Sequence, residues 1–335
     1  MLSNKPIVFS GVQPSGNLHL GNYLGAIAQW VVMQEKNQCI FCVVDYHAIT
    51  VKQEPEVLAK KIIEVAKIYL ASEIDPKKSI IFQQSDISAH TELTWILNCV
   101  ARISDLNKMT QFKDKAGEGQ ENVGIGLFDY PVLMASDILL YNTDAVPVGE
   151  DQAQHVELCR TLARRFNSQF GETFKIPEVV ISKEGARIMG LDDPSKKMSK
   201  SAASEYNYIG LTDKPEAAAK KIMKAVTDSG SEIKFDEKAK PAISNLLTIY
   251  SLLSDEPIKK LEVKYKGKGP ARAGRYGDFK KDLAEVVKKF LTDFQARYKK
   301  INDKEVEKIL EDGAKEAGLM ANETLKRVKE KIGIA

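Results

Sequence analysis

Short apolar runs alternate with stretches of helical apolar spacing throughout the first half of the chain, and this alternation restricts the fold more than any other feature. The runs that predict strands cover residues 7–10, 39–45, 79–82 and 145–148. Helices are predicted over residues 22–34, 56–71, 90–100, 132–140 and 152–166. Such alternation predicts an α/β fold, a doubly wound parallel sheet with helices on both faces. Ligands bind such sheets at the carboxyl ends of the strands, where the strand order reverses.

The second half is predicted to be mainly helical beyond residue 206, with one interruption by a Gly-rich loop at residues 267–277. A chain of 335 residues exceeds the roughly 100–200 residues usual for one domain. We therefore expect two domains, an α/β domain over residues 1–205 and a mainly helical domain over residues 206–335. Basic residues are denser in the second domain, but a net charge of +3 neither requires nor excludes a nucleic-acid partner. A solvated helical surface explains many of those lysines equally well.

The four cysteines predict neither a disulfide framework nor a zinc site. Cys39 and Cys42 form a C-x-x-C pattern inside a predicted strand, where positions three apart point to opposite faces. Cys99 and Cys159 form no second pair, so four zinc ligands are not expected. The sequence shows neither a leader pattern nor an apolar stretch long enough to cross a bilayer, so we expect a soluble protein of the cytoplasm.

The loop between the first predicted strand and helix carries the first candidate site. Its glycines allow a ligand to approach the backbone closely, and the start of the helix offers N–H groups to an anion. By itself such a turn indicates only some nucleotide or other ligand, and the chain lacks the phosphate-loop and dinucleotide patterns. In the run His19-Leu20-Gly21-Asn22, the first and last side chains offer donors to phosphate oxygens, while Gly21 leaves room for an adenosine.

A charged loop at residues 196–201, with the sequence Lys-Lys-Met-Ser-Lys-Ser, is the second candidate. By itself such a loop is more typical of a solvated turn. When a carboxylate attacks the α-phosphate of ATP, however, negative charge accumulates on the departing pyrophosphate and cations that close over it stabilise the transition state. Lys197 and Lys200 are the residues that we expect to do this, on a loop that Gly190 and its polar neighbours allow to close.

Asp137 lies in a strongly apolar predicted helix, where an isolated carboxylate would be costly to bury. Met134 lies one helical turn earlier on the same face. This pair suits an indole, because the thioether packs on the ring while the carboxylate accepts the ring N–H. The alternative is that Asp137 pairs with a local serine or with backbone and only stabilises its helix.

Together these segments resemble the signatures of the class I aminoacyl-tRNA synthetases, in the form found in bacterial tryptophanyl-tRNA synthetases. Residues 19–22 resemble His-Ile-Gly-His with Asn in the last place, and residues 197–201 match Lys-Met-Ser-Lys-Ser at all five positions. Residues 133–140 are similar to Leu-Met-Ala-Ala-Asp-Ile-Leu-Leu, with Ser136 as the one change, and tyrosyl relatives have Gln in the place of Met134. The resemblance covers essentially the whole chain. It implies a Rossmann-like catalytic domain and a helical C-terminal domain that binds the tRNA anticodon.

The resemblance also implies a set of residues for each substrate. The phosphates of ATP are assigned to the catalytic residues His19, Asn22, Lys197 and Lys200. The other nucleotide contacts would come from Gln13, Pro14, Ser15, Gly21, Gly149, Glu150, Asp151, Ile188, Met198, Ser199 and Ser201. The tryptophan site would comprise Asp137, Phe9, Gln13, His47, Tyr130 and Met134. By itself the Glu-Asp pair would more often cap a helix, and burial alone explains Phe9 and Met134.

The implied activity is the ligation of tryptophan to tRNA. Tryptophan and Mg-ATP give tryptophanyl-adenylate and pyrophosphate, and tryptophan is then transferred to tRNA(Trp). The phosphates of ATP are expected to hold the Mg²⁺, so no protein metal ligands are assigned. A homodimer is implied, with its interface in the segment between the two halves of the sheet.

Three alternatives stay open at this stage. They are a tyrosyl-tRNA synthetase, a small nucleotidyltransferase, and a non-catalytic paralogue that binds tryptophan or RNA. Two segments depart from the family pattern: the loop at residues 267–277 is longer than usual, and the stretch at residues 115–126 differs in form. Phosphate contacts of Lys113 and Lys115 are therefore left unassigned.

Overall fold

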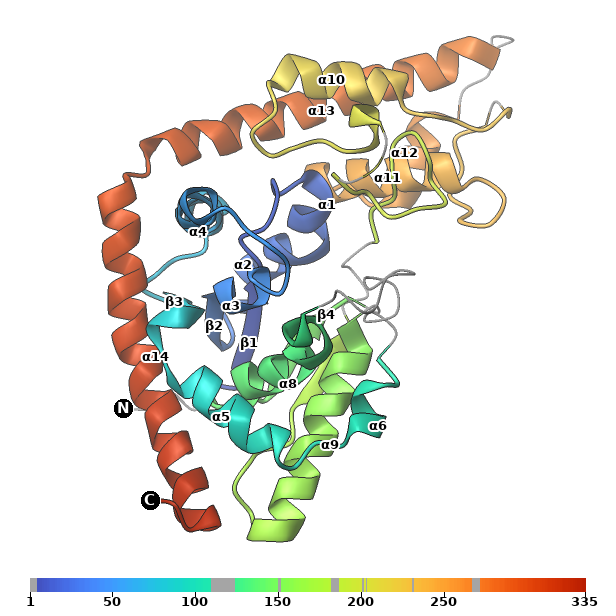
Figure 1. Ribbon diagram of the computed structural model, residues 1–335. Coiled ribbons are helices and arrows are strands. Elements are labelled where there is room, and N and C mark those ends of the chain that lie inside the picture. The colour runs from blue at the N-terminus through green and yellow to red at the C-terminus, as the bar shows by residue number, and fades with distance from the viewer. Residues whose placement is uncertain are drawn as a thin grey trace. The chain divides into compact units, whose positions relative to one another are not determined.

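The computed structural model describes residues 5–109, 124–149, 152–181, 187–200, 202, 204–230, 232–266 and 272–335. Five parallel strands form one sheet in the order β3-β2-β1-β4-β5 (Figure 1). They are β1 (Ile7–Val12), β2 (Gln38–Val43), β3 (Ser79–Gln83), β4 (Ala145–Val148) and β5 (Glu178–Ile181). The predicted parallel α/β fold is thereby confirmed. The strand order reverses between β1 and β4, because β2 and β3 lie on one side of β1 while β4 and β5 lie on the other.

Four strands lie where the apolar runs predict them, and two details differ. The second strand was expected to extend to residue 45, but β2 ends at Val43 and Asp45 begins helix α3 (Asp45–Ala48). The Asp45 carboxylate accepts hydrogen bonds from the backbone N–H and the hydroxyl of Ser85, which hold it at the start of this short helix. The fifth strand was not predicted from the sequence.

The chain forms two compact units, which are discontinuous in sequence. The sheet unit comprises Met1–Ser15, Trp30–Ser182 and Ile301–Ala335, and the helical unit comprises Gly16–Gln29 and Lys183–Lys300. The last helix of the chain therefore belongs with the sheet rather than with the helices that precede it. The predicted domains, residues 1–205 and 206–335, are each continuous in sequence, whereas these two units are not. The predicted division into functional domains stays a prediction.

Helices of the sheet unit cover the sheet. They are α3, α4 (Pro55–Ala71), α5 (Ala89–Asn98), α6 (Ile103–Leu106), α8 (Ile125–Leu139), α9 (Ala153–Phe170) and α14 (Asp303–Ile332). Helix α8 begins before Pro131, not after it as expected. Proline removes one backbone N–H, but the helix continues through it because nine of its residues, mostly apolar, are buried.

The two faces of β2 pack against different partners. Phe41 stacks on Trp30 with ring centroids 4.7 Å apart, whereas Cys42 belongs to the core cluster that contains Phe82 and residues of α5 and α8. Cys39 lies outside that cluster and is buried. This arrangement agrees with the prediction that the two thiols point to opposite faces, and both cysteines are free thiols.

Helix α14 runs along β3 at very short range (Figure 1). A Cβ atom at Gly313 would lie 2.0 Å from the backbone oxygen of Ile81, so only glycine permits this approach. The start of the helix is tied to α4 by an ion pair of 2.8 Å between Asp303 and Lys67. The C-terminal helix is therefore an integral part of the sheet unit.

The helical unit contains α1 (Leu20–Asn22) with the π-helical segment η1 (Tyr23–Ile27), followed later in the chain by α10 (Pro215–Lys224), α11 (Pro241–Ser254), α12 (Ile258–Lys264) and α13 (Arg272–Lys300). The short α2 (Ala28–Met33) continues η1 across the boundary between the units. The predicted loop at 267–277 is wrong over its last part, because α13 begins at Arg272, and residues 267–271 lie outside the described residues. Tyr276 is buried in the early part of this helix and donates to the Asp228 carboxylate at 2.6 Å, which holds the helix in place. Among the described residues, no helix is long and apolar enough to cross a membrane.

Candidate active site

The carboxyl edge of the sheet carries the first group of predicted residues. Gln13, Pro14 and Ser15 follow β1, and Gly149 follows β4. These are the two strands between which the strand order reverses, the position at which open α/β sheets bind ligands. The Ser15 hydroxyl lies 3.5 Å from the Gln13 side-chain oxygen, and Gly149 is exposed. Glu150 and Asp151, also predicted here, lie outside the described residues.

Asp137 is 1% exposed and accepts three hydrogen bonds from other elements of the sheet unit. Its Oδ1 atom accepts from Gln84 Nε2 and His90 Nδ1, each at 2.7 Å, and its Oδ2 atom accepts from His47 Nε2 at 2.7 Å. The carboxylate is therefore neither isolated nor bonded to a local serine. The neighbouring Ser136 hydroxyl instead donates to the backbone oxygen of Val132.

These partners decide the charge of Asp137. Burial raises the pKa of the carboxyl, but the hydrogen bonds from His47 and His90 are the leading causes that lower it, and the net pKa lies well below the ordinary value. The carboxylate is thus ionised and acts only as an acceptor. A buried, ionised acceptor is what an N–H donor on a ligand would require.

The aromatic residues predicted for the tryptophan site lie around this carboxylate or in the core beside it. Tyr130, on α8, is buried; its hydroxyl lies 2.8 Å from His155 Nε2 and its ring meets that of His47 at 6.1 Å in a T-shaped arrangement. Phe9 stacks on Tyr141 with ring centroids 5.5 Å apart. Met134 is half-buried and packs against the same core. These contacts explain the burial of Phe9 and Met134 by packing, and their roles as pocket walls remain predictions.

In the helical unit, His19 to Asn22 form a compact turn that opens α1. The backbone N–H of His19 donates to Asn22 Oδ1 at 3.0 Å. Backbone bonds join the segment to residues 209–211: the Leu20 N–H donates to the oxygen of residue 209 at 2.8 Å, and the N–H of residue 211 donates to the Leu18 oxygen at 3.1 Å. A Cβ atom at Gly21 would lie 3.0 Å from the His19 ring and 3.4 Å from Met198 Cβ. A larger residue at position 21 would therefore press on the His19 ring, within a turn that contacts the lysine loop, which we define as residues 188–200.

The His19 ring is almost fully buried, and its Nδ1 atom has no hydrogen-bond partner within the described structure. Burial lowers the pKa of His19, and repulsion from the Lys197 ammonium lowers it further, to about 4. At neutral pH the imidazole is therefore uncharged. It can offer a phosphate one N–H donor but no positive charge.

The two lysines predicted to act on pyrophosphate are exposed, whereas buried residues beside them are held by a backbone bond. Lys197 and Lys200 reach solvent, while Ile188 and Met198 are buried and joined by a backbone bond of 3.0 Å. The structure thus places exposed cationic side chains on a backbone that hydrogen bonds hold in place. Ser201, also predicted as a contact, lies outside the described residues.

Asn207 organises this loop and was not singled out from the sequence. Its side-chain oxygen accepts from the Ser199 backbone N–H at 2.8 Å, and its amide donates to Asp192 at 2.6 Å. A Cβ atom at Gly190 would lie 2.2 Å from the Asn207 amide nitrogen, so the glycine serves close packing here. This buried asparagine therefore links both ends of the lysine loop.

Gln84 and His90 are the other residues that the sequence analysis missed. Both follow β3, and a run of polar residues after a predicted buried strand, Gln83 to Asp86, is the local signal that points to Gln84. Nothing local pairs them with Asp137, which lies 53 and 47 residues further along the chain.

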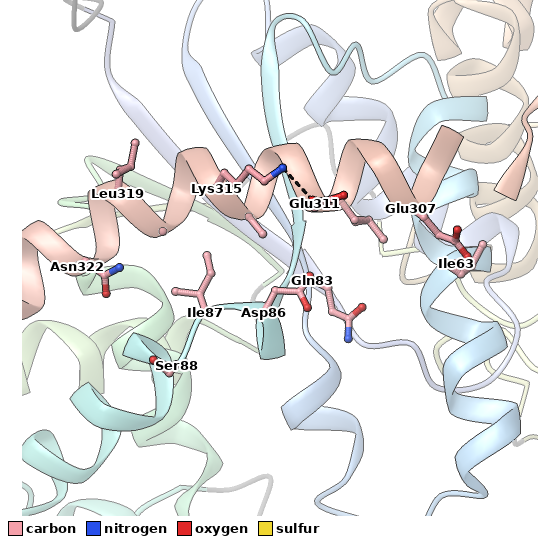
Figure 2. A pocket seen from close by; sticks show the side chains of 13 residues that line it. Ile63, Gln83, Asp86, Ile87, Ser88, Glu307, Glu311, Lys315, Leu319 and Asn322 are labelled. Atoms are coloured by element: carbon pink, nitrogen blue, oxygen red, sulfur yellow. Dashed lines mark ion pairs between the residues drawn. The ribbon is translucent and has the colours of Figure 1, made fainter. Parts of the chain in front are cut away.

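A hollow of about 610 Å³ lies elsewhere in the sheet unit, between α14 and the segment that follows β3 (Figure 2). Its lining includes the carboxylates of Asp86, Glu307 and Glu311, and the last pairs with Lys315 at 2.8 Å. None of the predicted site residues lines it. We therefore place the candidate active site at the residues described above rather than in this hollow.

Comparison with known proteins identifies the family. The model of the tRNA synthetases class I (W and Y) matches residues 2–292. The tryptophan–tRNA ligase of Caldanaerobacter subterraneus is 55% identical over 327 residues, which are 98% of each chain. The crystal structure of tryptophanyl-tRNA synthetase from Mycoplasma pneumoniae has a TM-score of 0.90 at 36% identity, covering 99% of this chain and 98% of that one. The Campylobacter jejuni tryptophanyl-tRNA synthetase complexed with ADP and tryptophan has a TM-score of 0.80 at 38% identity, covering 98% and 99%. The chain belongs to the class I tRNA synthetases for tryptophan and tyrosine, and within them to the tryptophan–tRNA ligases.

Proposed function

We propose how the side chains of this tryptophan–tRNA ligase share its reaction, in which tryptophan is activated with ATP and then transferred to tRNA(Trp). The proposed tryptophan site is based on the Asp137 carboxylate and its hydrogen-bond donors. The proposed ATP site is based on the His19 turn and the lysine loop.

In this proposal, Lys197 and Lys200 neutralise the charge that develops on pyrophosphate as it departs. Their exposure supports this role, because cations that approach as the charge forms stabilise the transition state more than the ground state. His19 and Asn22 donate to phosphate oxygens. The Asn22 oxygen is already bonded to the His19 N–H, so its amide N–H groups are the donors that remain. Ile188 and Met198, whose side chains are buried, would contact ATP through their backbone.

Mg²⁺ is assigned to the phosphates of ATP. Over the described ranges, no group of three or more His, Cys, Asp or Glu side chains is placed to hold a metal ion. When bound there, Mg²⁺ would offset phosphate charge. The side chains of this chain would bind and orient the phosphates that carry it.

Asp137 selects the amino acid by accepting the indole N–H. A ligand without this N–H would lose a hydrogen bond to a charged group, about 1.5–3 kcal/mol, or roughly 10- to 150-fold in kcat/KM. Met134 and Tyr130 would pack on the ring, with Phe9 behind them and His47 beside the carboxylate. The helical part of the chain beyond residue 206 would receive the anticodon of the tRNA.

We further propose that the chain works as a homodimer in the cytoplasm. We assign the interface to the part of the chain that connects β3 to β4. Three large apolar side chains of this segment support that choice. Trp95, Ile103 and Ile125 are 72%, 74% and 79% exposed in the single chain. Exposed apolar side chains of this size are typical of a surface that another subunit covers. Gel filtration that shows only a 37.3 kDa species at working concentration would exclude the dimer.

Amino-acid-dependent ATP–pyrophosphate exchange tests the proposed site. Tryptophan should drive exchange, while tyrosine and phenylalanine should not. The Asp137→Asn variant should lose at least about tenfold in kcat/KM for tryptophan. Asp129→Asn is the matched control, because Asp129 lies on the same helix but bonds to Asn98. Exchange driven by tyrosine, or equal losses in both variants, would overturn the assignment of Asp137.

A further inference from the structure

The two oxygens of the Asp137 carboxylate are used unequally. From the residues that the structure describes, Oδ1 accepts two hydrogen bonds, from Gln84 and His90, whereas Oδ2 accepts one, from His47. A carboxylate oxygen has two acceptor positions. Oδ1 is therefore saturated, and a further N–H donor can be accepted only at Oδ2.

Gln84 can act only as a donor toward Asp137. It is fully buried, and its side-chain oxygen accepts the backbone N–H of Tyr46 at 3.0 Å. This bond fixes the orientation of the amide group. The Nε2 atom must then face the carboxylate, as the structure shows.

His90 is oriented by Tyr141. Its Nδ1 atom donates to Asp137, so in the neutral ring Nε2 is an acceptor, and it lies 2.8 Å from the Tyr141 hydroxyl. The hydroxyl keeps its proton, because burial raises the pKa of Tyr141 well above the ordinary value. Tyr141 thus donates to His90, and His90 donates to Asp137.

Packing restrains both rings of this relay. Tyr141 stacks on Phe9 with ring planes 8° apart, and His90 stacks on Phe82 with centroids at 5.8 Å. Tyr141 and His90 are both inaccessible to solvent. The polar atoms of both rings bond along the relay toward Asp137, so we expect any effect on tryptophan to act through that carboxylate.

We propose that Tyr141 and His90 are positioning residues for the selection of tryptophan. With Gln84 they hold Oδ1 of Asp137, so that Oδ2, beside His47, is the single oxygen that accepts the indole N–H. The inference rests on the proposed role of Asp137. Without the Tyr141 hydroxyl, His90 can take the tautomer with its proton on Nε2. Its Nδ1 atom then no longer donates to Asp137, and the carboxylate loses one of the bonds that fix its rotation.

The test compares tryptophan with β-benzothienylalanine, in which sulfur replaces the indole N–H. The ratio of their kcat/KM values in ATP–pyrophosphate exchange reports the contact to Asp137 alone, since both rings have nearly the same shape. Tyr141→Phe and His90→Leu should each lower this ratio by about fivefold or more, corresponding to about 1 kcal/mol, with the KM for ATP unchanged. His90→Asn, whose amide can replace the Nδ1 donor, should restore most of it.

Tyr69→Phe is the matched control. Tyr69 is also fully buried, and its hydroxyl donates to the backbone oxygen of Cys42 at 3.1 Å rather than to the relay. It should lose stability but keep the wild-type ratio. If Tyr69→Phe lowers the ratio as much as Tyr141→Phe and His90→Leu do, the effect is structural and the proposal is overturned.

Two further results separate this proposal from the function on which it rests. If the wild-type protein does not distinguish the two amino acids, Asp137 does not read the N–H, and both proposals fail. If it does, but Tyr141→Phe and His90→Leu keep the ratio, only the positioning role fails. Nitrogen NMR of the wild-type histidines requires no variant to fold: the relay requires the Nδ1–H tautomer at His90, and the Nε2–H tautomer would overturn it.

Discussion

The low pKa of His19 makes the stability of the helical unit depend on pH in a predictable direction. The ring is 8% exposed, and burial together with Lys197 lowers its pKa from 6.5 to about 4. The unfolded chain has the ordinary pKa, so between pH 6.5 and about 4 the unfolded state binds a proton that the folded state does not. Stability is fully present above pH 6.5 and falls as the pH approaches 4, by up to about 3 kcal/mol.

A His19→Gln variant isolates this contribution, because the other titrating groups are common to both proteins. Urea unfolding at about pH 7.5 and about pH 5 should show the variant gaining about 2 kcal/mol relative to wild type at the lower pH. Carbon NMR of the four histidine rings gives the pKa of His19 directly. Lys197→Met should raise that pKa but leave it below 6.5, since burial is the larger cause. A measured pKa at or above 6.5, or a stability difference that does not change with pH, would refute the reasoning.

Two other substitutions test the packing that positions the site. Asn207→Ala removes the bonds to Ser199 and Asp192, and we expect it to lower kcat for exchange by about 5- to 150-fold while the KM for tryptophan stays unchanged. The half-exposed Asp193→Asn, in the same loop, should change kcat little. Gly313→Val should destabilise the protein by about 1–3 kcal/mol or more in thermal unfolding, because its side chain would collide with the Ile81 backbone. Gly318→Ala, in the same helix with open space around it, should be neutral or stabilising; equal losses in the two glycine variants would contradict the close approach of α14 to β3.

Sequence-based prediction succeeded where a feature is local. The four predicted strands are short apolar runs, and their burial in a parallel sheet follows from composition over four to six residues. The turn at His19 and the lysine loop were located for the same reason, since each is a run of adjacent residues. Gly190 was expected to let the loop move, but the structure shows a second requirement, the space that Asn207 occupies.

Prediction from the sequence failed where contacts join distant parts of the chain. The three donors to Asp137 lie 47, 53 and 90 residues away, so no window of residues contains both sides of any of these bonds. The placement of α14 beside β3 is a similar case. Its spacing of apolar residues predicts an amphipathic helix, but only the contact of Gly313 with Ile81 shows which surface that helix covers.

The buried network around Asp137 is difficult to explain by stability alone. Replacing a buried ionic cluster by apolar residues is often neutral or stabilising, whereas removing one member leaves other polar groups unpaired. A chain selected only for stability would therefore gain little from one carboxylate held by side chains from three separate segments. The network has a purpose if its single open acceptor, on Oδ2, is kept in place for a donor that arrives with the substrate. On this argument the donors at Oδ1 matter as much to selectivity as the carboxylate itself, and the benzothienylalanine comparison measures their contribution.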